Sequence, residues 1–130
     1  MKKMTKVAVY GTLKLWFHNH RLLDQVVKQW DDLIRFNTLS TSWFPLIDID
    51  KTWKSNNLIT VELYDIDNKT LESLDMLEWH PSFYKRIEVK TIWWEDVWVY
   101  TIKPSTDEKE DFFVKEEELN WKKVRIYNWK

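Results

Sequence analysis

The chain contains a single glycine, Gly11, which lies just beyond the apolar run Val7–Val9. Three apolar residues, two of them β-branched, are too few for a helix and favour a short buried strand. Glycine adopts backbone angles that other residues avoid, so Gly11 predicts a turn at the end of this strand. The turn could be a plain tight turn, or it could point consecutive N–H groups at a bound carboxylate. Both interpretations stay open from these residues alone.

Composition limits the classes of function that the chain can have. Its 130 residues fit one domain, which we expect to span 1–130, and 20 Lys and Arg residues balance 21 Asp and Glu residues. Because there is no basic excess and no long apolar run, we expect neither a nucleic-acid nor a membrane partner. The absence of cysteine excludes disulfides, thiol catalysis and cysteine-ligated zinc. We expect a cytoplasmic monomer.

Hydrophobic periodicity predicts an α+β fold. Helices are expected over 19–29, over 68–78 with Asp67 as the N-cap residue, and over 111–119. The clearest strand is 58–65, where Ile59, Val61 and Leu63 alternate with more polar neighbours. Further strands are expected at 6–9, 33–36, 44–49, 84–91, 96–102 and 123–127.

Glu78 is the sharpest candidate for a chemical role. Leu71, Leu74 and Glu78 fall at positions i, i+3 and i+7, so Glu78 shares the apolar stripe of the second helix, at its C-terminal end. Burial and the negative end of the helix dipole both disfavour a carboxylate anion, which would make this group a better base than a free glutamate. The alternative is an edge position, with the carboxylate solvated or paired with Lys85 or Arg86.

Other catalytic arrangements find little support in the sequence. His18, His20 and His80 could join a carboxylate in a metal site. However, His18 and His20 flank an expected helix start and would point apart, so we expect no metal. No serine lies in a G-x-S-x-G context, and there is no glycine-rich phosphate loop.

Two stretches resemble motifs of the γ-glutamylcyclotransferase-like (AIG2-like) family. Val7–Lys14, followed by Asn19–Arg21, resembles the N-terminal motif, and Leu71–Glu78, followed by His80–Arg86, resembles the second motif. Glu62–Tyr64 and Val97–Tyr100 also fit the family. The subgroup that the chain is most similar to acts on γ-glutamylamines.

The resemblance implies a mixed β-barrel flanked by helices and a reaction that needs no cofactor. Members of the family convert small γ-glutamyl compounds to 5-oxoproline and a free amine, and the residue matching the catalytic base is Glu78. The γ-glutamyl group would be held by Tyr10, Gly11, Thr12 and Leu13. Asn19, Tyr84 and Arg86 match motif positions near the site.

Bulkier residues, mostly tryptophan, stand at several positions where the family has glycine. Trp79 follows Glu78, Trp16 follows the first motif, and Val61 precedes the Glu-Leu-Tyr segment. Asn120–Trp121 and Asn128–Trp129 look like Asn-Gly turns with the glycine replaced, and Trp30, Trp43, Trp53, Trp93 and Trp94 also fall in expected turns or loops. Two alternatives to an active enzyme therefore stay open: a silent ligand-binding protein whose pocket is narrowed by Trp16 and Trp79, and an interaction domain with exposed tryptophans.

Overall fold

Strand β1 (Met4–Val9) runs through the middle of a mixed sheet. In the computed structural model, which describes residues 4–10, 28–41, 45–77 and 83–128, β1 pairs antiparallel with β4 (Asn57–Asp67) and parallel with β6 (Asp96–Thr101). Strands on both sides satisfy its backbone groups, and the core covers its side chains, so that Val7, Ala8 and Val9 are 0% exposed. The predicted strand at 6–9 is therefore confirmed as a central strand of the core.

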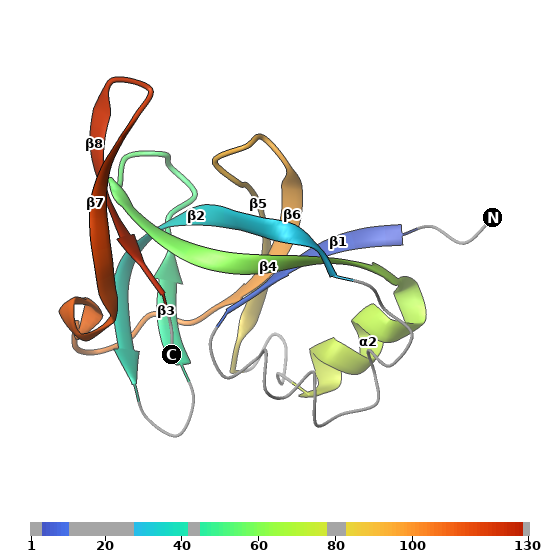
Figure 1. Ribbon diagram of the computed structural model, residues 1–130. Helices are drawn as coiled ribbons and strands as arrows, with labels where there is room; N and C mark the ends of the chain where they lie inside the picture. The colour runs from blue at the N-terminus through green and yellow to red at the C-terminus, as the bar shows by residue number, and fades with distance from the viewer. Residues whose placement is uncertain (1–3, 11–27, 42–44, 78–82, 129–130) are drawn as a thin grey trace.

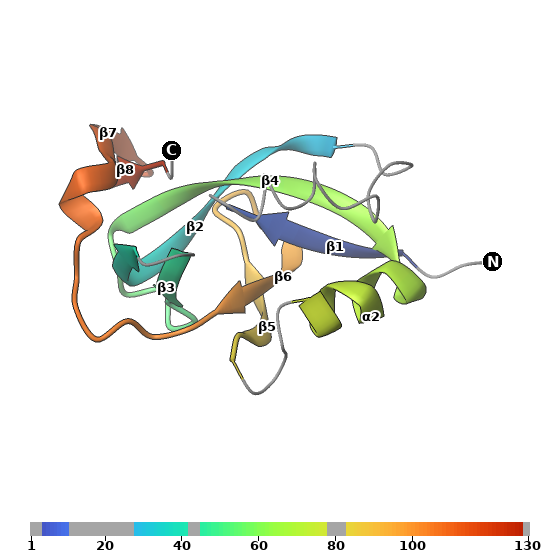
Figure 2. The ribbon, with the colours of Figure 1, turned by 90° about the horizontal axis from the view of Figure 1, so that it is seen from below.

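The sheet curls so that β3, the strand at one end of its order, comes close to the end of β6 (Figures 1 and 2). The strand order is β3-β2-β4-β1-β6-β5, with β2 at Lys28–Thr41, β3 at Pro45–Ile49 and β5 at Lys85–Lys90. Beyond this order, the Ile102 N–H donates to the Ile47 carbonyl at 2.9 Å, and the Ile49 N–H donates to the Thr101 hydroxyl at 3.0 Å. These bonds join β3 to the end of β6. The predicted α+β fold, a mixed β-barrel flanked by helices, is confirmed as a mixed sheet curled into a half-barrel, with helix α2 in the described part of the chain.

The concave side of the sheet holds the main hydrophobic core. Ile59, Val61 and Leu63 of β4 are all fully buried, as their alternation predicts. Burying a side chain of this size stabilises a fold by about 1.5–3 kcal/mol. The core thus gives β4, which also pairs with β2 and β8, a firmly specified register.

Helix α2 (Asn68–Leu77) begins where the sequence predicts. The Asp67 carboxylate accepts a hydrogen bond from the Thr70 N–H at 2.8 Å, which is the expected N-cap contact. The helix buries Leu74 and packs beside β1 and β4 on one side of the sheet (Figure 2). In the described part of the chain, no helix is long and apolar enough to cross a membrane.

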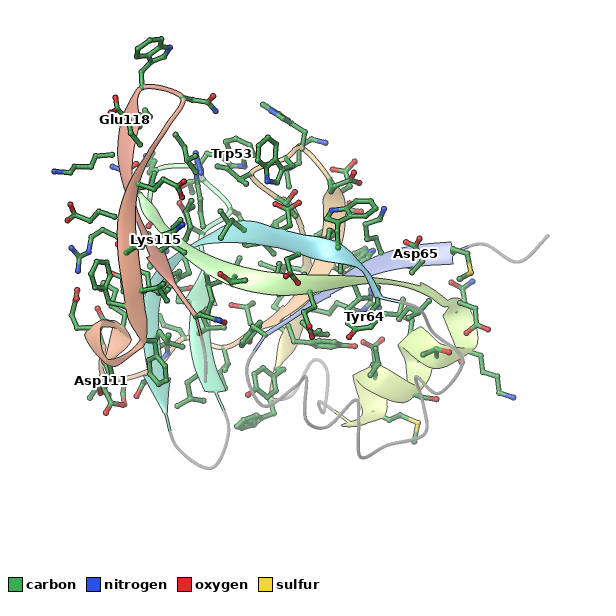
Figure 3. The ribbon with its side chains drawn as sticks, in the orientation of Figure 1. Trp53, Tyr64, Asp65, Asp111, Lys115 and Glu118 are labelled. Carbon is green, nitrogen blue, oxygen red and sulfur yellow. The ribbon has the colours of Figure 1, made fainter. Side chains whose placement is uncertain are left out.

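The helix predicted over 111–119 is wrong. A 3₁₀ turn at Lys109–Phe112 leads into strand β7 (Phe113–Leu119), which pairs with β8 (Lys122–Tyr127). Figure 3 shows Lys115 and Glu118 along β7. The acidic residues of β7 suit a helix by propensity, but they face basic residues across the hairpin, as in the pairs Glu116–Arg125 and Glu118–Lys123. Cross-strand pairing of opposite charges overrides the local preference.

Strand β2 is much longer than predicted. The sequence predicts a helix up to residue 29 and a short strand at 33–36, whereas β2 already includes Lys28 and Gln29. The rest of that predicted helix, 19–27, lies outside the described residues. Trp30, placed in a turn by the sequence, is in β2 next to a register shift, with the Lys6 ammonium 4.6 Å from its ring centroid.

Among the described residues, three tryptophans have the backbone conformation that favours glycine. Trp53, Trp94 and Trp121 have φ angles of 64°, 68° and 67°. Trp94 closes the β5–β6 turn, in which its N–H donates to the Thr91 carbonyl. Trp121 and Asn120, with φ of 50°, form the two-residue loop between β7 and β8. Two positive φ angles in such a loop define a type I′ turn, so the predicted glycine-type turn at 120–121 is confirmed.

The Asp32 carboxyl is buried within β2. Its side chain is 3% exposed, and one oxygen accepts a hydrogen bond from the Leu33 N–H at 2.7 Å. Burial raises the pKa of Asp32, and hydrogen bonds from Thr91, Leu33 and the Trp93 backbone only partly oppose this effect. For Asp50, burial is outweighed by hydrogen bonds from the Thr52 hydroxyl and from the N–H groups of Ser55, Thr52 and Lys54, so its pKa is lowered.

We predict that Trp121→Gly stabilises the protein. The side chain is 94% exposed, so its loss removes little burial, while a left-handed conformation costs an L-residue about 1–2 kcal/mol. Urea unfolding should show a higher free energy of unfolding. The control is Trp98→Gly, in the extended strand β6, which should lower it. Equal or lower stability for Trp121→Gly would contradict the prediction.

We predict opposite pH effects for Asp32→Asn and Asp50→Asn. A raised folded-state pKa means that the native protein binds the Asp32 proton more tightly, so ionised Asp32 destabilises it as pH rises toward neutrality. Asp32→Asn should therefore be more stable than the parent near neutral pH, with the gain vanishing below about pH 3.9. Asp50→Asn should be less stable near neutral pH and approach the parent in acid. Thermal melts across this range test both signs, and a gain for Asp32→Asn that grows in acid would refute the assignment.

Candidate active site

The structure describes three of the eight residues that the sequence assigns to the site. These are Tyr10, Tyr84 and Arg86. The other predicted site residues, and the two tryptophans expected to narrow the pocket, lie outside the described residues: Gly11, Thr12, Leu13, Asn19 and Glu78, together with Trp16 and Trp79. Tyr10, which precedes Gly11, and helix α2, which ends one residue before Glu78, are described, and their contacts show how these two ends are brought together.

Tyr10 lies at the end of β1 with its ring fully buried. Its hydroxyl donates a 2.7 Å hydrogen bond to the backbone carbonyl of Tyr100 on β6, a residue 90 positions away. Because β1 and β6 are parallel neighbours, this bond fixes the end of β1 against the end of β6. The chain continues from Tyr10 directly into the predicted binding turn at Gly11–Leu13.

Arg86 on β5 forms a bidentate ion pair with Asp75 on α2. Its Nε donates to Asp75 Oδ1 at 2.8 Å and its Nη2 donates to Asp75 Oδ2 at 3.0 Å. The guanidinium also lies over the Trp98 ring, 4.4 Å from its centroid. A planar fork matched to a carboxylate, with a cation–π contact on its face, holds the arginine in one orientation.

Tyr100 connects the two motifs. Its hydroxyl donates to Asp75 Oδ1 at 2.7 Å, while its backbone carbonyl accepts from Tyr10. Asp75 precedes Glu78 by three residues, and Tyr10 precedes Gly11 by one. A continuous set of hydrogen bonds therefore runs from the segment of the predicted base to the segment of the predicted binding turn.

Tyr84 is buried just before β5. It is 4% exposed, and its ring packs against Phe83 with centroids 5.2 Å apart. Its position two residues before Arg86 puts it beside the strand that carries the ion pair. It is thus close in the chain to the network that contains Asp75 and Tyr100.

Sequence reasoning missed Asp75, Tyr100 and Trp98. A signal for Asp75 was present, because it lies at i+4 from Leu71 and so falls on the same helical stripe as Leu74 and Glu78. Tyr100 faces Arg86 directly across the β5–β6 ladder. That partnership follows from the hairpin register, which the sequence alone leaves open.

A hollow at the other end of β1 contains none of the predicted site residues. It has a volume of about 510 Å³ and is lined by Met4–Lys6, Asp65, Glu88, Trp94–Asp96 and Trp98. Tyr10 lies at the opposite end of the strand. Among the described residues, no cluster of His, Asp and Glu side chains is arranged to hold a metal ion.

The comparisons with known proteins agree with the motifs. The family described as "Gamma-glutamyl cyclotransferase, AIG2-like" matches residues 7–123. The chain is 32% identical over 92 residues to a Methanocaldococcus jannaschii protein named "Putative gamma-glutamylcyclotransferase", a match that covers 68% of this chain and 73% of that protein.

Solved structures show the same fold. An uncharacterised protein from Pyrococcus horikoshii superposes with a TM-score of 0.60 at 25% identity, covering 79% of this chain and 83% of the other. A mouse AIG2-like protein gives a TM-score of 0.58 at 23% identity, covering 82% and 81%. With a family match across nearly the whole chain, a relative above 30% identity and this shared fold, the chain belongs to the gamma-glutamyl cyclotransferase, AIG2-like family.

Proposed function

We propose that the protein is a cyclotransferase that converts a γ-glutamylamine or γ-glutamyl peptide to 5-oxoproline and a free amine. The observation that carries the proposal is the hydrogen-bonded path Tyr10–Tyr100–Asp75–Arg86, which joins the segments of the two family motifs. Family membership supplies the reaction class. We further propose the γ-glutamylamine subgroup, a small-molecule substrate and a monomeric cytoplasmic enzyme.

The proposed chemistry is intramolecular. The α-amine nitrogen of the substrate attacks its own γ-carbonyl carbon, a five-membered ring closes, and the bond from that carbon to the leaving nitrogen breaks. Glu78 accepts the proton that the attacking amine loses and returns it to the leaving nitrogen, so protons balance without a cofactor. Holding the substrate in a folded conformation supplies much of the rate, because both reacting groups belong to one molecule.

Each predicted residue has a place in this proposal. Tyr10, Gly11, Thr12 and Leu13 bind the γ-glutamyl group, since a glycine-containing turn can present N–H groups to a carboxylate. Asn19 and Tyr84 complete the site. For Arg86 we propose a supporting role through Asp75, which holds its guanidinium in the structure.

We predict that Glu78→Gln removes turnover and leaves the fold intact. Glutamine keeps the size of the side chain but cannot accept the amine proton, and losing a positioned general base costs about 10²–10⁴ in rate. The assay is release of 5-oxoproline from γ-glutamyl-ε-lysine.

The matched control for this prediction is Glu72→Gln, an exposed glutamate on α2. It should keep the parent rate. If Glu78→Gln works within a few fold of the parent, Glu78 is not the base. If the parent binds the substrate but releases no 5-oxoproline, the protein is a silent binder.

A further inference from the structure

Within the described part of the chain, the Asp75 carboxylate accepts three hydrogen bonds from two strands. Two come from Arg86 on β5 and one from Tyr100 on β6, at 2.7–3.0 Å. The side chains of Arg86 and Asp75 are only 17% and 20% exposed, so water competes weakly for these groups. Charge-assisted bonds in such a setting are stronger than those of an exposed ion pair.

These bonds fix the last turn of α2 to the sheet. Asp75 lies two residues before Leu77, where α2 ends, and the last turn contains no basic residue that would stabilise the helix terminus from within. Arg86 and Tyr100 are directly paired across β5 and β6, so the two strands present their donors as one rigid unit. The position of the helix end is therefore set by the β5–β6 hairpin.

The same tyrosine also fixes the end of β1. The backbone carbonyl of Tyr100 accepts the Tyr10 hydroxyl, one residue before Gly11. Glu78 follows α2 directly in the chain. A displacement of about 1 Å in a catalytic group can lower the rate about 10²-fold. Tyr100, which contacts the ends of both β1 and α2, can therefore affect the rate by holding these two ends in place.

We propose that Asp75, Arg86 and Tyr100 form a clamp that fixes the end of α2, from which the chain continues to Glu78, relative to the end of β1, from which the chain continues to Gly11. The proposal rests on the proposed function. The three side chains are positioning residues: they act through the end of α2 and do not contact the substrate. Arg86 in particular serves Asp75 and does not bind the γ-glutamyl group.

Three variants test the clamp. Asp75→Asn removes the charge that Arg86 binds, Arg86→Lys keeps the charge but loses the fork geometry, and Tyr100→Phe removes one hydrogen bond. We expect kcat to fall about 10²-fold for the first two and less for the third, because a misplaced base slows the chemical step. KM should change little, since the γ-glutamyl group is held elsewhere.

The matched control is Asp96→Asn. Asp96 forms a 2.7 Å ion pair with Lys90 on the same hairpin, far from α2 in the ladder, and its loss should leave kcat unchanged. A rise in KM for Arg86→Lys with constant kcat would show direct substrate binding and overturn the clamp. So would parent-like kcat in Asp75→Asn, or a loss of kcat that disappears once each rate is corrected for the unfolded fraction measured in the assay.

Hydrogen exchange separates failure of the clamp from failure of the proposed function. In the clamp variants, the amides of residues 74–77 should exchange faster than in the parent, while those of β4 stay protected. If the parent makes no 5-oxoproline, the proposed function fails, and the exchange rates alone decide whether the clamp holds the helix end. Unchanged exchange at 74–77 overturns the clamp whatever the activity.

The tryptophans at positive φ carry a second, independent inference. Of the ten tryptophans, Trp30, Trp53, Trp93, Trp94, Trp98 and Trp121 are described, and three of these have φ between 64° and 68°. Positive φ is a true outlier for a bulky residue and ordinary for glycine. The chain as a whole has ten tryptophans and one glycine.

We infer that positions 53, 94 and 121 are glycine in the protein made by its own cell. The codon UGA differs by one base from the tryptophan codon UGG and by one base from the glycine codon GGA, and variant genetic codes assign it to either residue. UGA codons read as glycine at these positions would remove the strain. Trp98 is a real tryptophan on this view, because it lies in strand β6 and its ring contacts Arg86.

Tandem mass spectrometry of the protein isolated from its own cells tests this inference. Glycine is expected at 53, 94 and 121, and tryptophan at 98, with UGA codons at the first three positions and UGG at the last. Tryptophan at 53, 94 and 121 overturns the inference. Glycine at position 98 as well would show that positive φ does not distinguish positions that carry glycine in the cell from positions that carry tryptophan.

Discussion

The fold depends on burial of β1 between two strands of opposite direction. β4 pairs with it antiparallel and β6 pairs with it parallel, so both edges of the strand have backbone partners inside the sheet. The apolar run Val7–Val9 meets that constraint because it has no polar side chain to satisfy. Curling then brings β3 to the end of β6 and encloses the core (Figure 1).

Because β1 and β6 are parallel, their C-terminal ends point in the same direction and lie close together. Tyr10 and Tyr100 meet there through a backbone carbonyl, and the Tyr100 hydroxyl reaches across to Asp75 on α2. A β5–β6 hairpin of fixed register supplies Arg86 as the second partner of the same carboxylate. The described residues of the candidate site, Tyr10, Tyr84 and Arg86, thus lie at or near the ends of strands that the core holds in place.

The tight turns show a conflict between side chain and backbone. At Trp94 and Trp121, hairpin geometry requires positive φ, and the ladders on either side leave no freedom to relax. Packing between the rings of Trp53 and Trp94, whose centroids lie 4.9 Å apart, offsets part of the strain of their positive φ angles. The ring of Trp121 is almost fully exposed and has no such compensation from burial. The sequence indicated these positions because tryptophan follows asparagine or closes a polar loop where glycine is usual.

Local sequence patterns were enough to predict the features that depend on neighbours a few residues apart. The β4 alternation, the Asp67 cap, the hairpin after β5 and the Asn120–Trp121 turn all follow from local patterns, and the motif residues indicated the family. Tertiary structure alone decided that 113–119 is a strand, that β2 begins at Lys28, and that Arg86 pairs with Asp75. Those outcomes depend on strand register and on charges brought together from distant segments. Local propensity predicts neither the strand register nor the pairing of distant charges, because the burial of side chains in the common core fixes both.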